Sequence, residues 1–191
     1  MAIDSESRWR LVRMMRAKGE EPKRDHQVEI RDAVPGDLLA VTEIYNYYIT
    51  NSVVTFDLET MTVKDWESKF HWIQGLALPF IVAVSESGQI LGFAYVAPWR
   101  QKAAYRRTVE DSIYLKPAAT GKKIGTRLLD TLITKSKAAE VKEIVAVISD
   151  KGADSSIKLH ESFGFKHQGH LGKVGFKFGR WLGTVLMQKS L

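Results

Sequence analysis

Three strand-like segments follow one another between residues 79 and 115, and this run most constrains the fold. The stretch "PFIVAVSESGQILGFAYVAPW" holds two apolar segments joined around Ser87 and Gly88, a pattern typical of a β-hairpin. A third apolar segment, Thr108 to Leu115, follows a connecting loop. Strands that follow one another closely in sequence usually lie side by side and antiparallel. The run therefore predicts the antiparallel centre of a sheet.

Helical and extended patterns alternate on both sides of this run. The helical segments carry apolar residues at spacings of three and four, which marks one buried face. The expected helices are 38–49, 62–73, 124–139 and 154–165, the last closed by Gly164, and the remaining strands are 28–33, 141–149, 166–171 and 183–191. This order predicts an α/β (α+β) fold with a mixed, mostly antiparallel sheet and helices on both faces. Residues 172–183, rich in glycine, aromatic residues and lysine, are expected to form a long functional loop.

Composition places the chain among globular proteins with one main domain. It has 191 residues, of which 45% are hydrophobic and 26% charged, and no apolar run approaches the roughly 20 residues of a membrane span. The absence of cysteine excludes disulfides and thiolate chemistry. The net charge of +6 is scattered, so we expect no nucleic-acid partner and no membrane association. Residues 1–27 are expected to be a charged extension, flexible or partly helical, ahead of a domain at 28–191.

The turn after the third central strand carries the strongest local signal for a ligand. In "LKPAATGKKIGTRLL", Gly121 and Gly125 allow close backbone approach, and Lys122 and Lys123 add positive charge at the start of a helix. A helix N-terminus presents unpaired N–H groups and the positive end of the helix dipole, so it attracts phosphate. The spacing matches neither a nucleoside-triphosphate loop nor a dinucleotide fingerprint. Taken alone, the turn is equally compatible with a simple helix cap.

Four further segments carry a resemblance to a known family. They are "IYNYYITNSVVTF" (44–56), "GFAYVAPWRQKAAYRRTVEDSIYL" (92–115), "IKLHESFGF" (157–165) and "VGFKFGRW" (174–181). Together with the glycine-lysine turn, they resemble the GNAT superfamily of N-acetyltransferases, and within it the phosphinothricin and methionine sulfoximine acetyltransferase group. The resemblance covers residues 28–191 and implies a GNAT-type fold. It also implies acetyl-CoA as co-substrate, a small-molecule amine as acceptor and a homodimer. A cytoplasmic location is expected, because the N-terminal region lacks the apolar core of a secretory signal.

The chain departs from the family pattern at a few positions. Thr120 and Lys123 stand where the signature of the pyrophosphate loop has Gln or Arg and a glycine. Ala153 replaces a usual asparagine, and Gly183 stands where an aspartate often follows "GRW". These departures leave two alternatives beside the small-molecule enzyme: an acyl-CoA-binding module with weakened catalysis, and an N-acetyltransferase of peptides or proteins.

Glu110 and His160 are the candidate catalytic residues. Strand alternation places Glu110 and Asp111 on opposite faces of the third central strand. The competing interpretation of Glu110 is a structural, ion-paired glutamate, but the resemblance implies that it is the general base. Asp111 ranks second, as a structural or supporting acid. His160 lies four residues after Ser156 on a helix, and its place before "ESFGF" matches the position of a catalytic side chain in the family.

The resemblance also implies the residues that bind the two substrates. An arginine fork suits a carboxylate or phosphinate, and an aromatic side chain could wall the acceptor pocket. The expected acceptor-binding residues are Phe56, Arg100, Tyr105 and Arg106. No metal site is expected, because the histidines lack ligand spacing. The expected acetyl-CoA-binding residues are Ile113, Tyr114, Leu115, Gly121, Lys122, Lys123, Ile124, Gly125, Thr126 and Ser156.

Overall fold

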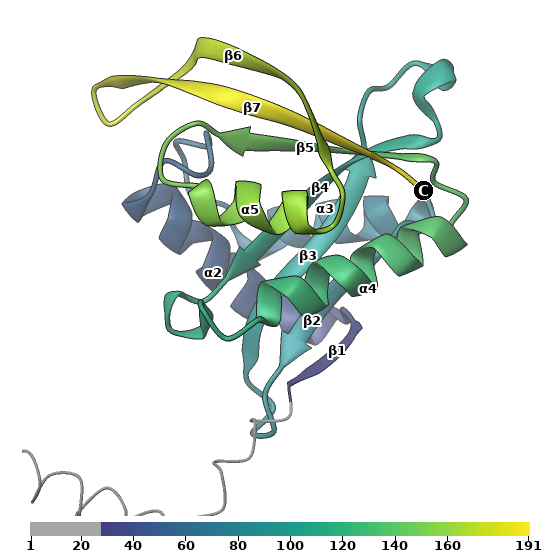
Figure 1. Cartoon of the computed structure of the whole chain (residues 1–191). Helices are drawn as coiled ribbons and strands as arrows, with labels where there is room; N and C mark the ends of the chain where they lie inside the picture. The colour runs from purple at the N-terminus through teal and green to yellow at the C-terminus, as the bar shows by residue number, and fades with distance from the viewer. Residues whose placement is uncertain (1–27) are drawn as a thin grey trace, which may run out of the picture.

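The computed structural model describes residues 28–191 as one seven-stranded sheet with helices on both faces (Figure 1). The order of its long helices and strands is the order that the sequence predicts. The charged extension expected at residues 1–27 lies outside the described residues.

The long elements have the following bounds. The strands are β1 (Glu29–Asp32), β2 (Phe80–Val84), β3 (Ile90–Pro98), β4 (Thr108–Leu115), β5 (Glu143–Ser149), β6 (Lys166–Lys177) and β7 (Arg180–Ser190). The helices are α2 (Leu38–Asn51), α3 (Val63–Gly75), α4 (Ile124–Ala138) and α5 (Asp154–Ser162). Short 3-10 turns lie at η1 (Pro35–Asp37), η2 (Ala103–Tyr105) and η3 (Pro117–Ala119).

The centre of the sheet contains one parallel pair of strands, and this pair opens into a gap. The strand order is β1-β2-β3-β4-β5-β7-β6, and of its neighbouring strands within residues 28–191 only β4 and β5 run parallel. They pair only from Thr108 to Glu110 on β4, although β4 continues to Leu115 and β5 to Ser149. The second half of β4 therefore diverges from β5 and leaves backbone groups available between the two strands.

Two apolar cores hold the layers on either side of the sheet. On one side α4 buries Leu128, Leu129 and Leu132 completely, at the spacing that its sequence shows. On the other side α2 and α3 pack around the fully buried Trp66, whose ring makes an edge contact with Phe93 of β3. Each such large apolar side chain stabilises the fold by roughly 2 kcal/mol when buried. The cores thereby fix β4 in the middle of the molecule.

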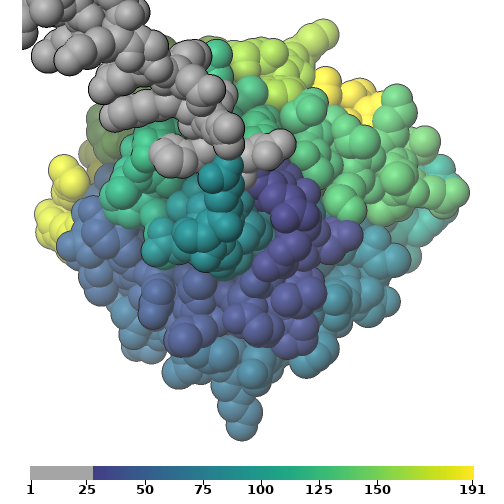
Figure 2. All heavy atoms as spheres, turned by 90° about the horizontal axis from the view of Figure 1, so that it is seen from below, coloured from purple at the N-terminus to yellow at the C-terminus, as the bar shows by residue number. Residues whose placement is uncertain are grey.

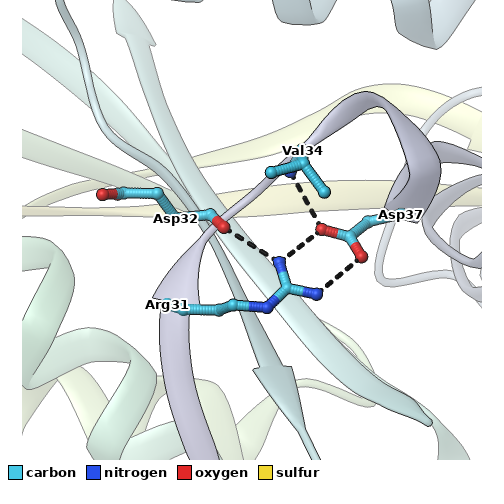
Figure 3. Close-up of polar contacts among 4 residues, drawn as sticks. All are labelled: Arg31, Asp32, Val34 and Asp37. Carbon is cyan, nitrogen blue, oxygen red and sulfur yellow. Dashed lines mark hydrogen bonds and ion pairs between the residues drawn. The ribbon is translucent and has the colours of Figure 1, made fainter. Parts of the chain in front are cut away.

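An ion pair links the first strand to the first helical segment. Arg31 of β1 donates two hydrogen bonds to Asp37, at 2.6 and 2.8 Å, and Asp37 also accepts from the backbone N–H of Val34 (Figure 3). Such a two-point arginine–carboxylate contact is among the stronger polar contacts. Seen from below, residues from this part of the chain, purple to blue, cover the middle of the surface, and the C-terminal residues lie at its margins (Figure 2).

The prediction of a long loop at residues 172–183 is wrong, because these residues form a long β-hairpin. Strand β6 continues to Lys177 and pairs there with Arg180, the first residue of β7. Only Phe178 and Gly179 form the turn, and both have positive φ values, 51° and 71°. Two consecutive residues with positive φ match the twist of a tight hairpin. The yellow-green hairpin projects at the top of Figure 1.

Within residues 28–191, no helix combines the length and apolar character needed to cross a membrane.

Candidate active site

A cleft of about 600 Å³ lies where β4 and β5 diverge. Its walls come from the second half of β4, the end of β5, the first turn of α4 and one face of α5. Tyr48 and Val54 line it from the region of α2. Glu110 and Asp111 lie at the point where the pairing of β4 with β5 stops, so the cleft begins at these two carboxyl groups.

The first turn of α4 provides the phosphate-binding features that its sequence predicts. The helix has Lys123 at its N-cap and no side-chain cap, so the backbone N–H groups that follow are not satisfied by a capping side chain. Gly121, Lys123, Ile124, Gly125 and Thr126 all line the cleft. Open amides, the helix dipole and a lysine ammonium fit a diphosphate group.

Lys123 itself adopts a conformation that favours glycine. Its φ is 58° and its ψ is 11°, the left-handed region, where most side chains crowd the backbone. This observation gives a physical reason for the glycine of the family signature at this position. In this chain the turn has the left-handed conformation although a lysine replaces the glycine. The strained residue, Lys123, lies in the wall of the cleft.

Glu110 is a partly buried carboxyl group with the properties of a base that works near neutral pH. Burial and, to a smaller extent, the charge of the neighbouring Asp111 raise the pKa of Glu110, Lys69 lowers it, and the net result is a pKa of about 7. A carboxylate in water titrates near pH 4. Since the best general bases have a pKa near the working pH, the environment of Glu110 suits proton abstraction.

His160 projects from α5 into the same region and is almost completely buried, with 3% of its side chain exposed. Its Nε2 lies 2.9 Å from Oδ2 of Asp111, and its Nδ1 lies 2.8 Å from the carbonyl oxygen of Ser156. Burial opposes a charge on the ring, but the hydrogen bond and attraction to Asp111 and the bond to Ser156 outweigh it, so the pKa of His160 is raised. Both ring nitrogens therefore face acceptors, and the charged imidazolium satisfies both.

The structure brings most of the predicted catalytic and cofactor residues together in one cleft. This placement describes geometry only, and the roles stay predictions. The predicted residues that line the cleft are Glu110, His160, Ile113, Tyr114, Leu115, Gly121, Lys123, Ile124, Gly125, Thr126 and Ser156.

The expected acceptor-binding residues and Lys122 do not line the cleft. Arg100 lies over the ring of its neighbour Trp99, with 5.3 Å between the guanidinium carbon and the ring centre. Tyr105 and Arg106 lie on the exposed loop between β3 and β4. The ring of Phe56 packs against Gly175 of β6, where a Cβ atom would be 2.5 Å from it.

Sequence reasoning missed the contribution of β5 and of the start of α5. The end of β5, from Ala146 to Ser149, lines the cleft, as do Ser155 and Lys158 of α5. One signal was present in the sequence. A helix joins β4 to β5, such connections join parallel strands, and ligands gather at the carboxyl ends of parallel strands.

Gly183, one of the departures from the family pattern, has a structural explanation. A Cβ atom at this position would lie 2.6 Å from both Oδ2 of Asp150 and the carbonyl oxygen of Leu171. Asp150 accepts hydrogen bonds from the Gly183 N–H and from His170, at 2.9 and 3.0 Å. A carboxylate from the end of β5 therefore occupies the space beside Gly183.

Among residues 28–191, no group of three or more His, Cys, Asp or Glu side chains is arranged to hold a metal ion.

Comparison with known protein families gives one match, over residues 41–165, to the acetyltransferase (GNAT) family. Two similar characterised proteins are a phosphinothricin N-acetyltransferase and a methionine sulfoximine/sulfone acetyltransferase. The first, from Alcaligenes faecalis, is 37% identical over 155 residues, 81% of this chain and 78% of the relative. The second, from Pseudomonas aeruginosa, is 35% identical over 162 residues, 85% of this chain and 94% of the relative.

Solved structures give the same result. A GNAT superfamily phosphinothricin acetyltransferase from Sinorhizobium meliloti, in complex with acetyl-CoA, is 42% identical. It superposes with a TM-score of 0.82 over 86% of this chain and 88% of its own. An N-acetyltransferase from Staphylococcus aureus is 36% identical, with a TM-score of 0.82 over 86% of this chain and 98% of its own.

Proposed function

Because this chain belongs to the GNAT acetyltransferase family, and is an acetyl-CoA-dependent N-acetyltransferase of the phosphinothricin and methionine sulfoximine acetyltransferase group, we propose how it acts and on what. The acetyl group moves from acetyl-CoA to the amine of a small amino-acid-like substrate of the phosphinothricin, methionine sulfoximine or methionine sulfone type. One observation carries the proposal: Glu110, a carboxyl group with a pKa of about 7, lies in the same cleft as the uncapped start of α4.

The cofactor is held in this proposal by the cleft between β4 and β5. The backbone amides from Ile124 to Thr126, with Lys123, take the diphosphate, and the unpaired edge of β4 from Ile113 to Leu115 receives the arm that carries the acetyl group. The co-substrate supplies an activated thioester. Backbone N–H groups of the same edge polarise the thioester carbonyl as negative charge develops on its oxygen.

Glu110 is the general base of the proposed reaction. It accepts a proton from the substrate ammonium, directly or through water, so that the neutral amine can attack the acetyl carbon. The acetyl–sulfur bond then breaks as the new acetyl–nitrogen bond forms. A positioned base of this kind contributes typically 10²- to 10⁴-fold in rate. The partial burial of Glu110 supports this role, because it makes the carboxylate basic enough to take the proton near neutral pH.

His160 is proposed as the group that meets the leaving thiolate. Acceptors at both ring nitrogens favour the charged ring, in agreement with its raised pKa, and its place in the wall of the cleft brings that charge to the thiol end of the cofactor. The imidazolium stabilises the developing negative charge on sulfur, and the thiolate takes its proton from water, because Asp111 and Ser156 hold both N–H groups of His160.

Phe56, Arg100, Tyr105 and Arg106 remain the proposed acceptor-binding residues. Arg100 and Arg106 offer guanidinium groups for a carboxylate or phosphinate, and both side chains are exposed. The same exposure favours a second candidate acceptor, the amino terminus of a peptide, which needs an open approach.

A thiol-release assay tests the proposed substrate class. Purified protein and acetyl-CoA are incubated with methionine sulfone, phosphinothricin, ordinary amino acids and a short peptide, and free thiol is followed with time. We expect release with the sulfone or phosphinothricin and a fall of 10²-fold or more in Glu110→Gln near pH 7.5. Release with the peptide alone would replace the small-molecule proposal. Equal rates for wild type and Glu110→Gln at every pH would remove Glu110 from the mechanism.

We further propose that the enzyme is a homodimer that works in the cytoplasm. Several apolar side chains on the hairpin of β6 and β7 are more than half exposed. They include Phe176 and Trp181, whose ring centroids lie 5.4 Å apart. Exposed apolar patches of this kind often mark protein interfaces. The supply of acetyl-CoA inside the cell supports the location, which cell fractionation tests.

A further inference from the structure

Asp111 and His160 form a buried ion pair where β4 and β5 begin to diverge. Only 2% of the Asp111 side chain and 3% of the His160 side chain are exposed, and 2.9 Å separate Oδ2 of Asp111 from Nε2 of His160. The carbonyl oxygen of Ser156 occupies the other ring nitrogen. A carboxylate and a carbonyl only accept hydrogen bonds, so the geometry requires a proton on each ring nitrogen.

The second oxygen of Asp111 has no hydrogen-bond partner among the described residues. This atom, Oδ1, is buried, and an unpartnered carboxylate oxygen inside a protein carries a free-energy cost. His160 therefore compensates the carboxylate at one oxygen only. The unpartnered oxygen belongs to the residue next to Glu110 on the same strand.

We propose that Asp111 is a positioning residue for acetyl transfer, which fixes His160 as an imidazolium on one face of β4 and places a carboxylate next to Glu110 on the other. The inference rests on the proposed role of Glu110 as general base. Side chains alternate along β4, so Asp111 points to α5 and contacts His160, and Glu110 points to the opposite side of the sheet. Asp111 is therefore next to both residues.

The ammonium group of Lys69 has the opposite effect to Asp111 on the pKa of Glu110. Lys69 of α3 donates a hydrogen bond from Nζ to the Tyr95 hydroxyl at 2.7 Å, and it lies over the rings of Tyr95 and Trp66. The groups that act on Glu110 are thus Asp111 from its own strand, which raises its pKa, and Lys69 from α3, which lowers it. Removing either charge should shift the titration of Glu110, in opposite directions.

Three variants test the proposal through the pH dependence of kcat/KM for methionine sulfone. Asp111→Asn keeps the shape of the side chain, removes its charge and leaves His160 neutral. Because Asp111 is the direct neighbour of Glu110 and His160 lies on α5, the lost carboxylate dominates, so the acid limb should move to lower pH. Lys69→Gln should move the same limb to higher pH. Asp130→Asn removes an exposed carboxylate from α4 and should leave the limb in place. No shift in Asp111→Asn, or a shift in the same direction as in Lys69→Gln, would overturn the proposal.

A second measurement needs no activity. In the unliganded wild type, ¹H–¹⁵N spectra of the histidine rings should show His160 with protons on both nitrogens at pH 7, and Asp111→Asn should show a neutral ring. A neutral His160 in the wild type would overturn the proposal. Should the wild type release no thiol with any amine, the proposed function fails while these spectra still decide the state of the Asp111–His160 pair.

Discussion

Glu110 illustrates how a single residue can favour catalysis at the cost of stability. Its pKa in the folded chain is about 7, against an ordinary value of 4.5 for glutamate, because burial disfavours its ionised form. The folded state therefore binds a proton more tightly than the unfolded state does. The contribution of Glu110 to the free energy of unfolding is fully present below pH 4.5. It falls as the pH rises and is lost above the folded pKa of about 7.

Replacing this carboxyl group should consequently stabilise the protein at neutral and alkaline pH. Relative to wild type, Glu110→Gln should gain up to about 3 kcal/mol in the free energy of unfolding between pH 5 and pH 8. Urea unfolding at several pH values measures this difference. Glu67→Gln, at an exposed position of α3, serves as the control and should show no such trend. A pH-independent difference for Glu110→Gln would contradict the raised pKa.

Lys123 presents a similar conflict between backbone strain and ligand binding. Its left-handed conformation costs about 1 kcal/mol that glycine avoids. Lys123→Gly should therefore raise the free energy of unfolding by up to about 1 kcal/mol, and weaken coenzyme A binding roughly two- to fivefold through the lost ammonium. Denaturant unfolding and calorimetry measure the two effects. As a control, the neighbouring substitution Lys122→Gly should not raise the free energy of unfolding. An unchanged affinity of Lys123→Gly for coenzyme A would show that Lys123 does not bind the diphosphate.

At the scale of helices and strands, the sequence predicted the order of the elements and most of the cleft. Periodic apolar residues were sufficient for α2, α3, α4 and the central strands, because each of these elements buries one regular face. The hairpin of β6 and β7 was missed in part. Most residues of β6 are exposed, so the strand has no buried alternation to detect, and its turn uses Phe178-Gly179 in place of the usual Asn-Gly.

Only the parts of the candidate site that carry a local sequence motif could be predicted. The glycine-lysine turn marked the start of α4, and "TVE" marked Glu110. Asp111 ranked second to Glu110, as a structural or supporting acid. Its contact with His160 could not be predicted, because it joins residues that are 49 positions apart. The positions of Arg100 and Arg106 outside the cleft depend on a loop conformation that composition does not determine.

The contact between β7 and the end of β5 leads to a prediction about Gly183. Gly183→Ala should lower the free energy of unfolding by about 1–3 kcal/mol, because its Cβ would collide with the Leu171 carbonyl oxygen and with Asp150. Gly169→Ala on the same hairpin, where nothing lies within 4 Å of the added carbon, should stay within about 0.5 kcal/mol of wild type. Thermal unfolding compares the two, and equal effects would contradict the crowding at position 183.

At the scale of the whole molecule, the exposed hairpin is the surface that we expect to join two copies. Trp181→Ser should shift the protein from dimer towards monomer in sedimentation velocity, because it removes a large apolar side chain that is 57% exposed. Trp72→Ser offers a matched control, since this tryptophan of α3 is 49% exposed and lies on a different element. A monomeric wild type, or equal behaviour of both variants, would contradict the dimer.

The central claim concerns where the cofactor lies relative to Glu110. A crystal structure of the protein with coenzyme A measures this directly. We expect the diphosphate on the amides of residues 124–126 beside Lys123, and the sulfur between β4 and β5 close to Asp111, His160 and Glu110. Coenzyme A bound at another surface, with the gap between β4 and β5 empty, would contradict the account.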